Sequence, residues 1–289
     1  MSIRTDLAVE SARQISLTQD IEGIDRHISI DDEAQLEITD ITINTADAAE
    51  IIGKPQGRYI TIKALDGSLD KFSPHFEKRA DIIAQQIKKL DENSKSVLVA
   101  GLGNRAITPD AIGPLCAEKI FATRHIKMYA QEIDSSDLTE LSVIETGVLG
   151  QTGVEASEQV KAVADRISPE VVVAVDALAC SEPEHIGCTV QLCNTGISPG
   201  SGVENARKEL SRATLGVTCI AVGVPTVIDL STAAEKMFNQ TAPQGTKGFT
   251  VTPRDVDKLV KNAAEYIALG INLAFQPNLT AEDLRSLVD

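Results

Sequence analysis

The sequence predicts an α/β fold in which a mostly parallel sheet is sandwiched by helices, with a smaller mixed region before it. From Ser96 onward, continuous apolar runs alternate with glycine-rich turns and helical stretches, which is typical of parallel strands covered on both faces. Before that point, single apolar residues alternate with polar ones, as in half-buried strands. With 289 residues, of which 43% are hydrophobic, the chain is long enough to bury a substantial core.

The N-terminal third is expected to form a mixed region, residues 7–95, whose short strands pack on the core. Alternation of apolar and polar residues predicts strands at 28–30, 36–38, 41–43 and 58–62. The apolar residues between 72 and 90 fall near helical spacing. We therefore expect a helix there, leading into the main region.

Residues 96–289 are expected to form the α/β core. Apolar runs and helical spacing predict strands at 97–100, 171–175, 189–193 and 219–222 and a helix at 155–167. Thr252 and Pro253 suit an N-cap and a first helical turn, and an apolar stripe follows them to Ile267. A short terminal helix is expected after Thr280, because acidic residues suit its first turn.

Composition and charge exclude several classes of protein. The longest apolar runs are far shorter than the roughly 20 residues that span a bilayer, so no membrane segment is expected. The first six residues are already charged and lack the apolar stretch of a secretory signal. The 5 scattered cysteines suit reduced thiols and a cytoplasmic protein. A net charge of −15 without a basic cluster predicts no direct binding to nucleic acid.

Two carboxylates lie where parallel strands are expected to end. Asp176 follows the apolar run 171–175, and Asp110 lies on the loop that leaves 97–100. Because ligands bind beyond the carboxyl ends of parallel strands, both acids should open onto one edge of the sheet. Such a pair can divide general-base and general-acid roles around a water. The alternative for Asp110 is a helix cap or first-turn acid, since it follows Pro109.

Two glycine-rich loops are candidate substrate-binding segments, one after the strand at 97–100 and one after the strand at 189–193. The candidate residues on them are Gly101, Gly103, Asn104, Gly200 and Gly202. The first loop also matches part of the dinucleotide-binding fingerprint, but a lone match is weak. For both loops, an ordinary turn is the alternative.

No metal and no cofactor is expected. His185, Cys188 and Cys193 have the residue types of zinc ligands, but no second pair with finger-like spacing follows them. His125 is expected to be structural. The sequence has neither a Gly-x-Ser-x-Gly elbow nor a His-Glu-x-x-His motif, so the serine and zinc peptidase templates are unsupported.

Several segments nevertheless resemble one known family, in the right order along nearly the whole chain. They are residues 2–10, 101–104, 108–114, 123–125, 174–179, 199–203 and 223–227. They resemble the germination protease family, also called the spore protease family. The core also resembles that of hydrogenase maturation proteases, which use a similar strand, glycine-rich loop and acidic residue.

The resemblance implies an endopeptidase that initiates degradation of small acid-soluble spore proteins during germination, in the cytoplasm of the forespore and spore core. It implies that Asp110 and Asp176 are the catalytic aspartates and that cleavage follows an acidic residue. Arg207 and the adjacent Lys208, just after the second glycine-rich loop, are candidate partners for that acid, and a solvated helix face is the alternative for them. The resemblance also implies a zymogen with a short propeptide, residues 1–6, that cleaves itself between Asp6 and Leu7. Members of the family resemble homo-oligomers, in particular tetramers.

Two other hypotheses stay open. One is a nucleotide-binding or inactive scaffold on the same α/β sheet, which has no need for paired carboxylates. The other is a metal-assisted, maturation-type peptidase that uses Asp110, Asp176 and a histidine, and resistance of the activity to strong chelators would argue against it. The chain also departs from some members of the family, because its segment 230–251 is short.

Overall fold

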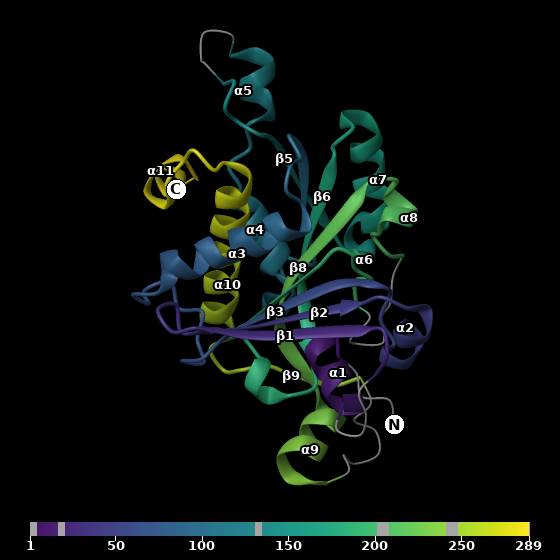
Figure 1. Ribbon diagram of the computed structural model, residues 1–289. Coiled ribbons are helices and arrows are strands. Elements are labelled where there is room, and N and C mark those ends of the chain that lie inside the picture. The colour runs from purple at the N-terminus through teal and green to yellow at the C-terminus, as the bar shows by residue number, and fades with distance from the viewer. Residues whose placement is uncertain (1–4, 17–20, 131–134, 201–207, 241–247, 289) are drawn as a thin grey trace.

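The computed structural model describes residues 5–16, 21–130, 135–200, 208–240 and 248–288 (Figure 1). The strands in these ranges are β1 (Ile24–Asp31), β2 (Leu36–Ile43), β3 (Gly57–Ala64), β4 (Ser96–Leu102), β5 (Glu140–Gly147), β6 (Val171–Cys180), β7 (Thr189–Cys193), β8 (Thr218–Asp229) and β9 (Thr250–Val251). The helices are α1 (Ala8–Ser16), α2 (Ala46–Ile52), α3 (Phe76–Leu90), α4 (Ile112–Glu118), α5 (Arg124–Tyr129), α6 (Leu149–Thr152), α7 (Ala156–Ile167), α8 (Arg212–Leu215), α9 (Leu230–Phe238), α10 (Val256–Phe275) and α11 (Ala281–Val288). Short 3₁₀ helices, η1 (Thr108–Asp110) and η2 (Pro183–His185), follow β4 and β6.

These strands form one mixed sheet. Their order is β1-β2-β3-β7-β8-β6-β4-β5, and β9 pairs with β8 at the end of that strand. Strands β8, β6, β4 and β5 are parallel to one another, whereas β1, β2, β3 and β7 join the sheet in antiparallel pairs. The predicted α/β fold is therefore confirmed, with its parallel part confined to the second half of the sheet.

The N-terminal strands continue this sheet, whereas the sequence suggested that they pack on the core. Strand β3 pairs with β7 from Tyr59 opposite Cys193 to Lys63 opposite Thr189. The strands themselves are visible as alternation in the sequence, but this pairing joins segments separated by α3, β4, β5 and β6. The division of the chain near residue 95 stays a prediction.

The sheet has two differently covered faces, because successive side chains of a strand point to opposite sides. Val171, Val173 and Val175 of β6 face the core formed with α3, α4 and α10. Val172 and Ala174 point to the other face, where α7 and α8 pack on the parallel strands. On that same face, α1 and α2 cover the antiparallel strands. Figure 1 shows α3, α4 and α10 on one side of the sheet and α2, α7 and α8 on the other.

The long C-terminal helix begins later than the sequence predicts. Helix α10 starts at Val256 with Asp255 at the N-cap, so the expected cap at Thr252 is wrong. The Thr252 hydroxyl donates instead to the carbonyl oxygen of Thr226 at 2.9 Å. The Val256 N–H donates to the carbonyl oxygen of Pro253, which closes a turn before the helix. Residues 252 and 253 therefore belong to the connection from β9.

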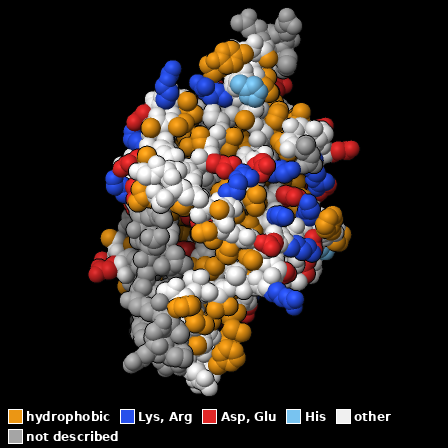
Figure 2. Space-filling view, turned by 180° about the vertical axis from the view of Figure 1, so that it is seen from behind, with side chains coloured by type: hydrophobic (Ala, Val, Ile, Leu, Met, Phe, Trp, Pro, Cys, Tyr) orange, Lys and Arg blue, Asp and Glu red, His pale blue; other side chains and the backbone are white. Residues whose placement is uncertain are grey.

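The surface carries charges of both signs. Figure 2 shows acidic and basic side chains interspersed among apolar ones, with exposed apolar side chains gathered at the lower end, where Figure 1 places α9. Met237 and Phe238 of α9 and Phe249 are exposed. No helix of the described chain is long and apolar enough to cross a membrane.

Helix α4 approaches the sheet backbone to backbone. A Cβ atom on Gly113 would lie 2.1 Å from the carbonyl oxygen of Leu102 and 2.5 Å from that of Val175. A Cβ atom on Gly101 would in turn lie 2.3 Å from the carbonyl oxygen of Gly113. Both glycines are therefore required by close packing, since no side chain fits between the helix and the end of β4 or the middle of β6.

We expect Gly113→Ala to lower the free energy of unfolding by about 2–4 kcal/mol, because the added methyl meets rigid backbone on two strands. Urea unfolding followed by circular dichroism measures this loss. Gly150→Ala is the matched control, since nothing lies within 4 Å of a Cβ atom at Gly150, on α6. The control should change stability by no more than about 1 kcal/mol. Equal effects of the two substitutions would contradict the packing argument.

Candidate active site

A row of three residues crosses the middle of the sheet on the face shared by α1 and α7. Asp176 of β6 pairs with Gly223 of β8, and Gly223 pairs with Gln191 of β7. Paired residues on neighbouring strands point to the same face, so the Asp176 and Gln191 side chains flank a glycine. A Cβ atom on Gly223 would lie 2.7 Å from both the carbonyl oxygen of Asp176 and the Leu178 side chain, so a glycine is required between the carboxylate and the amide.

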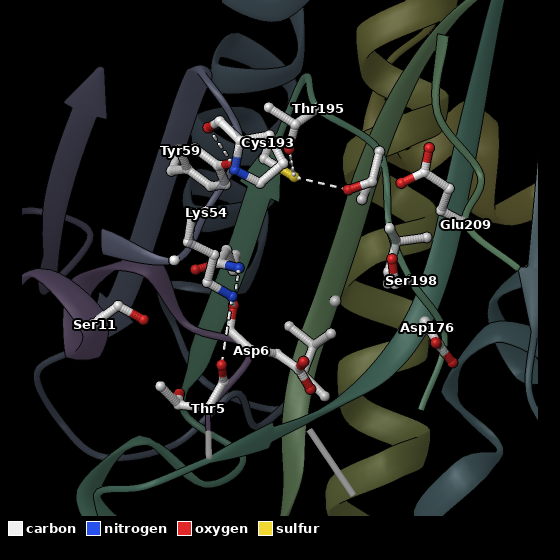
Figure 3. Close-up of a pocket in the computed structure, with 18 of the residues that line it drawn as sticks. Thr5, Asp6, Ser11, Lys54, Tyr59, Asp176, Cys193, Thr195, Ser198 and Glu209 are labelled. Carbon is white, nitrogen blue, oxygen red and sulfur yellow. Dashed lines mark hydrogen bonds between the residues drawn. The ribbon is translucent and has the colours of Figure 1, made fainter. Parts of the chain in front are cut away.

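A cavity of about 550 Å³ lies above this row of residues (Figure 3). Segments distant in the sequence meet around it: the N-terminal residues, the loop after α2, strands β6, β7 and β8, and the loop after β7. The polar and charged residues that line it are Thr5, Asp6, Ser11, Lys54, Tyr59, Asp176, Gln191, Thr195, Ser198 and Glu209. The cavity is thus large enough to hold a short stretch of polypeptide.

Asp176 is almost fully buried, with 4% of its surface exposed. The N–H of Ala177 donates to its Oδ1 at 2.9 Å. The sequence suggested that the strand ends before Asp176, but β6 continues to Cys180 because it stays paired with β8. Asp176 therefore lies within β6. It nevertheless lies next to a strand end, because Gly101, one residue before the end of β4, pairs with Val175.

Asp110 lies in η1, on the loop that leaves β4, and is half-buried. The N–H of Asn104 donates both to its Oδ2 at 2.9 Å and to its carbonyl oxygen at 3.0 Å. The carboxylate therefore closes its own loop, and no side chain caps α4. The close packing of Gly113 against Leu102 and Val175 keeps this loop at the end of β4 and beside the middle of β6. Asp110 is not among the residues that line the cavity.

The glycine-loop candidates are divided between two environments. Gly101 and Gly103 pack against the backbone of Gly113 and Asp110, respectively, and do not line the cavity. The Asn104 side chain accepts hydrogen bonds from the Ala106 N–H and the Gln151 side chain. Gly200 does line the cavity, whereas Gly202 and Arg207 lie outside the described residues. Lys208 forms an exposed ion pair with Glu158 at 2.7 Å.

The peptide bond between Asp6 and Leu7 lies at the cavity. The Asp6 N–H donates to the carbonyl oxygen of Ala179 at 2.9 Å, and the Ala179 N–H donates to Asp6 Oδ2 at 2.8 Å. The Asp6 carbonyl oxygen accepts hydrogen bonds from Lys54 Nζ at 2.9 Å and from Gln191 Nε2 at 2.7 Å. Leu7 is fully buried. Both the backbone and the carboxylate of Asp6 are thus bound in a defined geometry.

Glu10 of α1 holds the N-terminal segment, residues 5–7, against the chain that follows β6. It is buried and accepts hydrogen bonds from the N–H and hydroxyl of Ser181, both at 2.7 Å, from the Glu182 N–H at 3.0 Å, and from the Thr5 hydroxyl. Its Oε1 lies 2.5 Å from His185 Nδ1. Burial raises the pKa of Glu10, but the hydrogen bonds from His185, Thr5 and Ser181 outweigh burial and hold that pKa below its usual value.

The residues whose types suggested zinc ligands each have another environment in the structure. His185 is the partner of Glu10, and the Cys188 thiol donates to the carbonyl oxygen of Glu184 at 3.0 Å. Cys193 lines the cavity. No group of three or more metal-ligating side chains that could hold an ion occurs among the residues that the structure describes.

Lys54, Gln191 and Glu10 are site residues that the sequence reasoning missed. Gln191 carried a signal, because a polar residue between Val190 and Leu192 in a buried strand needs a partner. Lys54 carried no such signal in the sequence, since it lies in an ordinary turn. Glu10 falls in a segment that resembled the family, but nothing marked it as buried.

An α/β sheet that holds a peptide segment over a buried carboxylate suits the peptidase class. The model of the germination protease family matches residues 3–242, and the chain belongs to this family. It is therefore a peptidase, and its substrates are proteins.

Two germination proteases agree with this assignment. The germination protease of Caldanaerobacter subterraneus subsp. tengcongensis is 38% identical over 100% of this chain and 98% of its own. That of Bacillus subtilis is 40% identical over 80% of this chain and 65% of its own. Among solved structures, the [NiFe] hydrogenase maturation protease HycI from Thermococcus kodakarensis matches 69% of this chain and 99% of its own, at a TM-score of 0.39 and 19% identity.

We expect Glu10→Gln to lower the free energy of unfolding by about 2–4 kcal/mol at pH 7, because an amide cannot accept all the hydrogen bonds that the buried carboxylate accepts. The folded-state pKa of Glu10 lies below the usual 4.5, so its contribution is fully present above that value and is lost as pH falls through the folded pKa. Urea unfolding of both proteins at several pH values should show the difference shrinking in acid. The exposed Glu92→Gln should match wild type throughout, and a difference that does not depend on pH would contradict this role of the charge.

Proposed function

We propose that this chain is an aspartic-type endopeptidase that initiates degradation of small acid-soluble spore proteins during germination, in the cytoplasm of the forespore and spore core. In this proposal Asp110 and Asp176 activate the attacking water. The chain is made as a zymogen and cleaves itself between Asp6 and Leu7. One observation carries the proposal: the Asp6–Leu7 bond lies at the cavity that Asp176 lines, with its carbonyl oxygen held by two side chains.

The contacts of Asp6 support a preference for an acidic residue before the cut. Its carboxylate accepts a hydrogen bond from the Ala179 N–H, and the Lys54 ammonium group lies close by, on its carbonyl oxygen. A fixed N–H donor and a nearby cation favour a carboxylate at this position. These groups join Arg207, which lies outside the described residues, as candidates for recognising the acid.

In the proposed reaction, the carboxylates divide the proton transfers. One aspartate takes a proton from the water as its oxygen attacks the carbonyl carbon of Asp6, and the other, protonated, supplies a proton as the C–N bond breaks. The products are the carboxyl group of Asp6 and the amino group of Leu7. The reaction needs no cofactor.

The same geometry supports the zymogen proposal. Thr5 and Asp6 line the cavity, and Asp6 takes up the hydrogen bonds of Lys54, Gln191 and the Ala179 N–H, so another chain cannot bind these groups while Asp6 is in place. Cleavage after Asp6 separates these residues from the buried Leu7 and frees those groups for a substrate. We also propose that the protein works as a homo-oligomer, with the tetramer as the form that the family resemblance implies.

We expect Asp176→Asn and Asp110→Asn each to slow self-cleavage and cleavage of spore-protein peptides by at least about 10²–10⁴-fold, because an isosteric amide cannot exchange the required proton. Sequencing of the new N-terminus and a peptide assay measure both activities, and circular dichroism checks that the variants fold.

The exposed Asp137→Asn is the control and should keep full activity. An active Asp110→Asn would leave Asp110 as a residue that only closes its loop. Cleavage that continues in excess chelator would argue against the metal-assisted hypothesis. A chain that never forms a Leu7 terminus, at any pH from about 5 to 8, would contradict self-processing.

A further inference from the structure

The Asp6 carbonyl oxygen is held by donors from two distant parts of the chain. Lys54 extends from the turn after α2 and places Nζ at 2.9 Å, and Gln191 extends from β7 and places Nε2 at 2.7 Å. Figure 3 shows Lys54 directed toward Asp6 and Thr5. Both donors already lie within hydrogen-bond distance of the oxygen that gains negative charge when water adds to the carbonyl carbon, and enzymes stabilise such a charge with donors about 2.7–3.1 Å from the charged oxygen.

The environment of Lys54 suits the stabilisation of a developing negative charge better than it suits a structural ion pair. Its ammonium group donates to the backbone carbonyl oxygens of Asp6 and, at 3.4 Å, of Thr5. Burial lowers the pKa of Lys54, and the nearby Asp6 carboxylate only partly opposes this effect. A cation that is poorly solvated gains most from a negative charge that forms beside it.

The orientation of Gln191 is fixed by a second hydrogen bond. Its Oε1 accepts from the Ala8 N–H at 2.6 Å, so Nε2 is the atom directed at Asp6. The Gln191 side chain thus forms hydrogen bonds with the backbone on both sides of Leu7. Because Ala8 lies after the cleavage point, this bond can persist once Thr5 and Asp6 have left, and it keeps Nε2 directed at the vacated position.

We propose that Lys54 and Gln191 are catalytic residues that stabilise the negative charge on the carbonyl oxygen of the bond being cut, both in self-cleavage and in cleavage of protein substrates. The inference rests on the proposed function. When water adds to the Asp6 carbonyl carbon, the carbonyl oxygen becomes the charged oxygen of a tetrahedral intermediate, on which both donors already lie. As the intermediate collapses, the bond to the Leu7 nitrogen breaks and that nitrogen takes a proton.

The test uses the full chain and measures the rate at which the Leu7 terminus forms. In parallel, a synthetic peptide with residues 2–12 of this chain serves as the substrate of the processed enzyme, which gives kcat and KM. We expect Lys54→Met and Gln191→Leu each to lower both the processing rate and kcat by about 10²–10³-fold, because each removes one donor from the charged oxygen. The double variant should lose less than the product of the two, since the donors act on one atom.

Two matched controls separate this role from a structural one. Lys71→Met removes an exposed lysine that pairs with Glu265. Gln276→Leu removes a buried glutamine whose side chain bonds Thr139 far from the cavity. The first should resemble wild type, and the second should lower the melting temperature while kcat stays within a few-fold of wild type. If Gln191→Leu does not fold, Gln191→Glu, which keeps the acceptor for the Ala8 N–H, takes its place.

The outcomes distinguish the inference from the proposed function. A loss of kcat in the Lys54 and Gln191 variants, with folding intact and KM little changed, supports the inference. Near wild-type rates in both, in a protein that Asp176→Asn inactivates, would overturn the inference and leave the proposed function standing. Failure of the wild type to cut either bond, or full activity of Asp176→Asn, would remove the proposed function and the inference with it.

Discussion

The close approach of α4 to the sheet is the constraint on which the site depends. At Gly113 the helix backbone lies directly on the carbonyl oxygens of Leu102 and Val175, so β4, β6 and the helix cannot shift independently. The loop between β4 and α4 therefore turns sharply, and its Asp110 carboxylate bonds back to the Asn104 N–H. A packing requirement thus determines where this acid lies relative to the strand that carries Asp176.

A second constraint holds the N-terminal segment against the sheet. The buried Glu10 carboxylate accepts hydrogen bonds from Ser181, Glu182, His185 and Thr5. These donors take the place of the water molecules that an exposed carboxylate would bind. A buried carboxylate with this many partners is stable only while the partners stay in place. Leu7 can therefore be fully buried beside a bond that remains at the cavity, and the chain can present that bond without unfolding α1.

Sequence reasoning succeeded where a pattern is local and failed where the answer depends on pairing between distant strands. Continuous apolar runs predicted the parallel strands β4, β6 and β8, because burial on both faces leaves a local signature. The parallel edge strand β5 has no such run and was not predicted. The continuation of β6 past Asp176 has no such signature, since it depends on pairing with β8. Gln191 reaches the cavity only because its strand pairs with β8 opposite Gly223. The sequence around Lys54 is that of an ordinary turn and does not indicate a site residue, because the role of Lys54 depends on Asp6, which lies across the cavity.

Binding in this cavity is divided between the backbone and one side chain of the bound segment. Lys54 and Gln191 contact a carbonyl oxygen that every peptide has, whereas the Ala179 N–H contacts the carboxylate that distinguishes Asp6. Backbone contacts tolerate many sequences, and a single fixed donor for a carboxylate selects among them. This division is what an enzyme needs if one cavity is to receive first its own N-terminal segment and then other chains. The glycine at position 223 serves the same site by packing, because a Cβ atom there would lie 2.7 Å from the Asp176 carbonyl oxygen and from the Leu178 side chain and would displace the strand that carries Asp176.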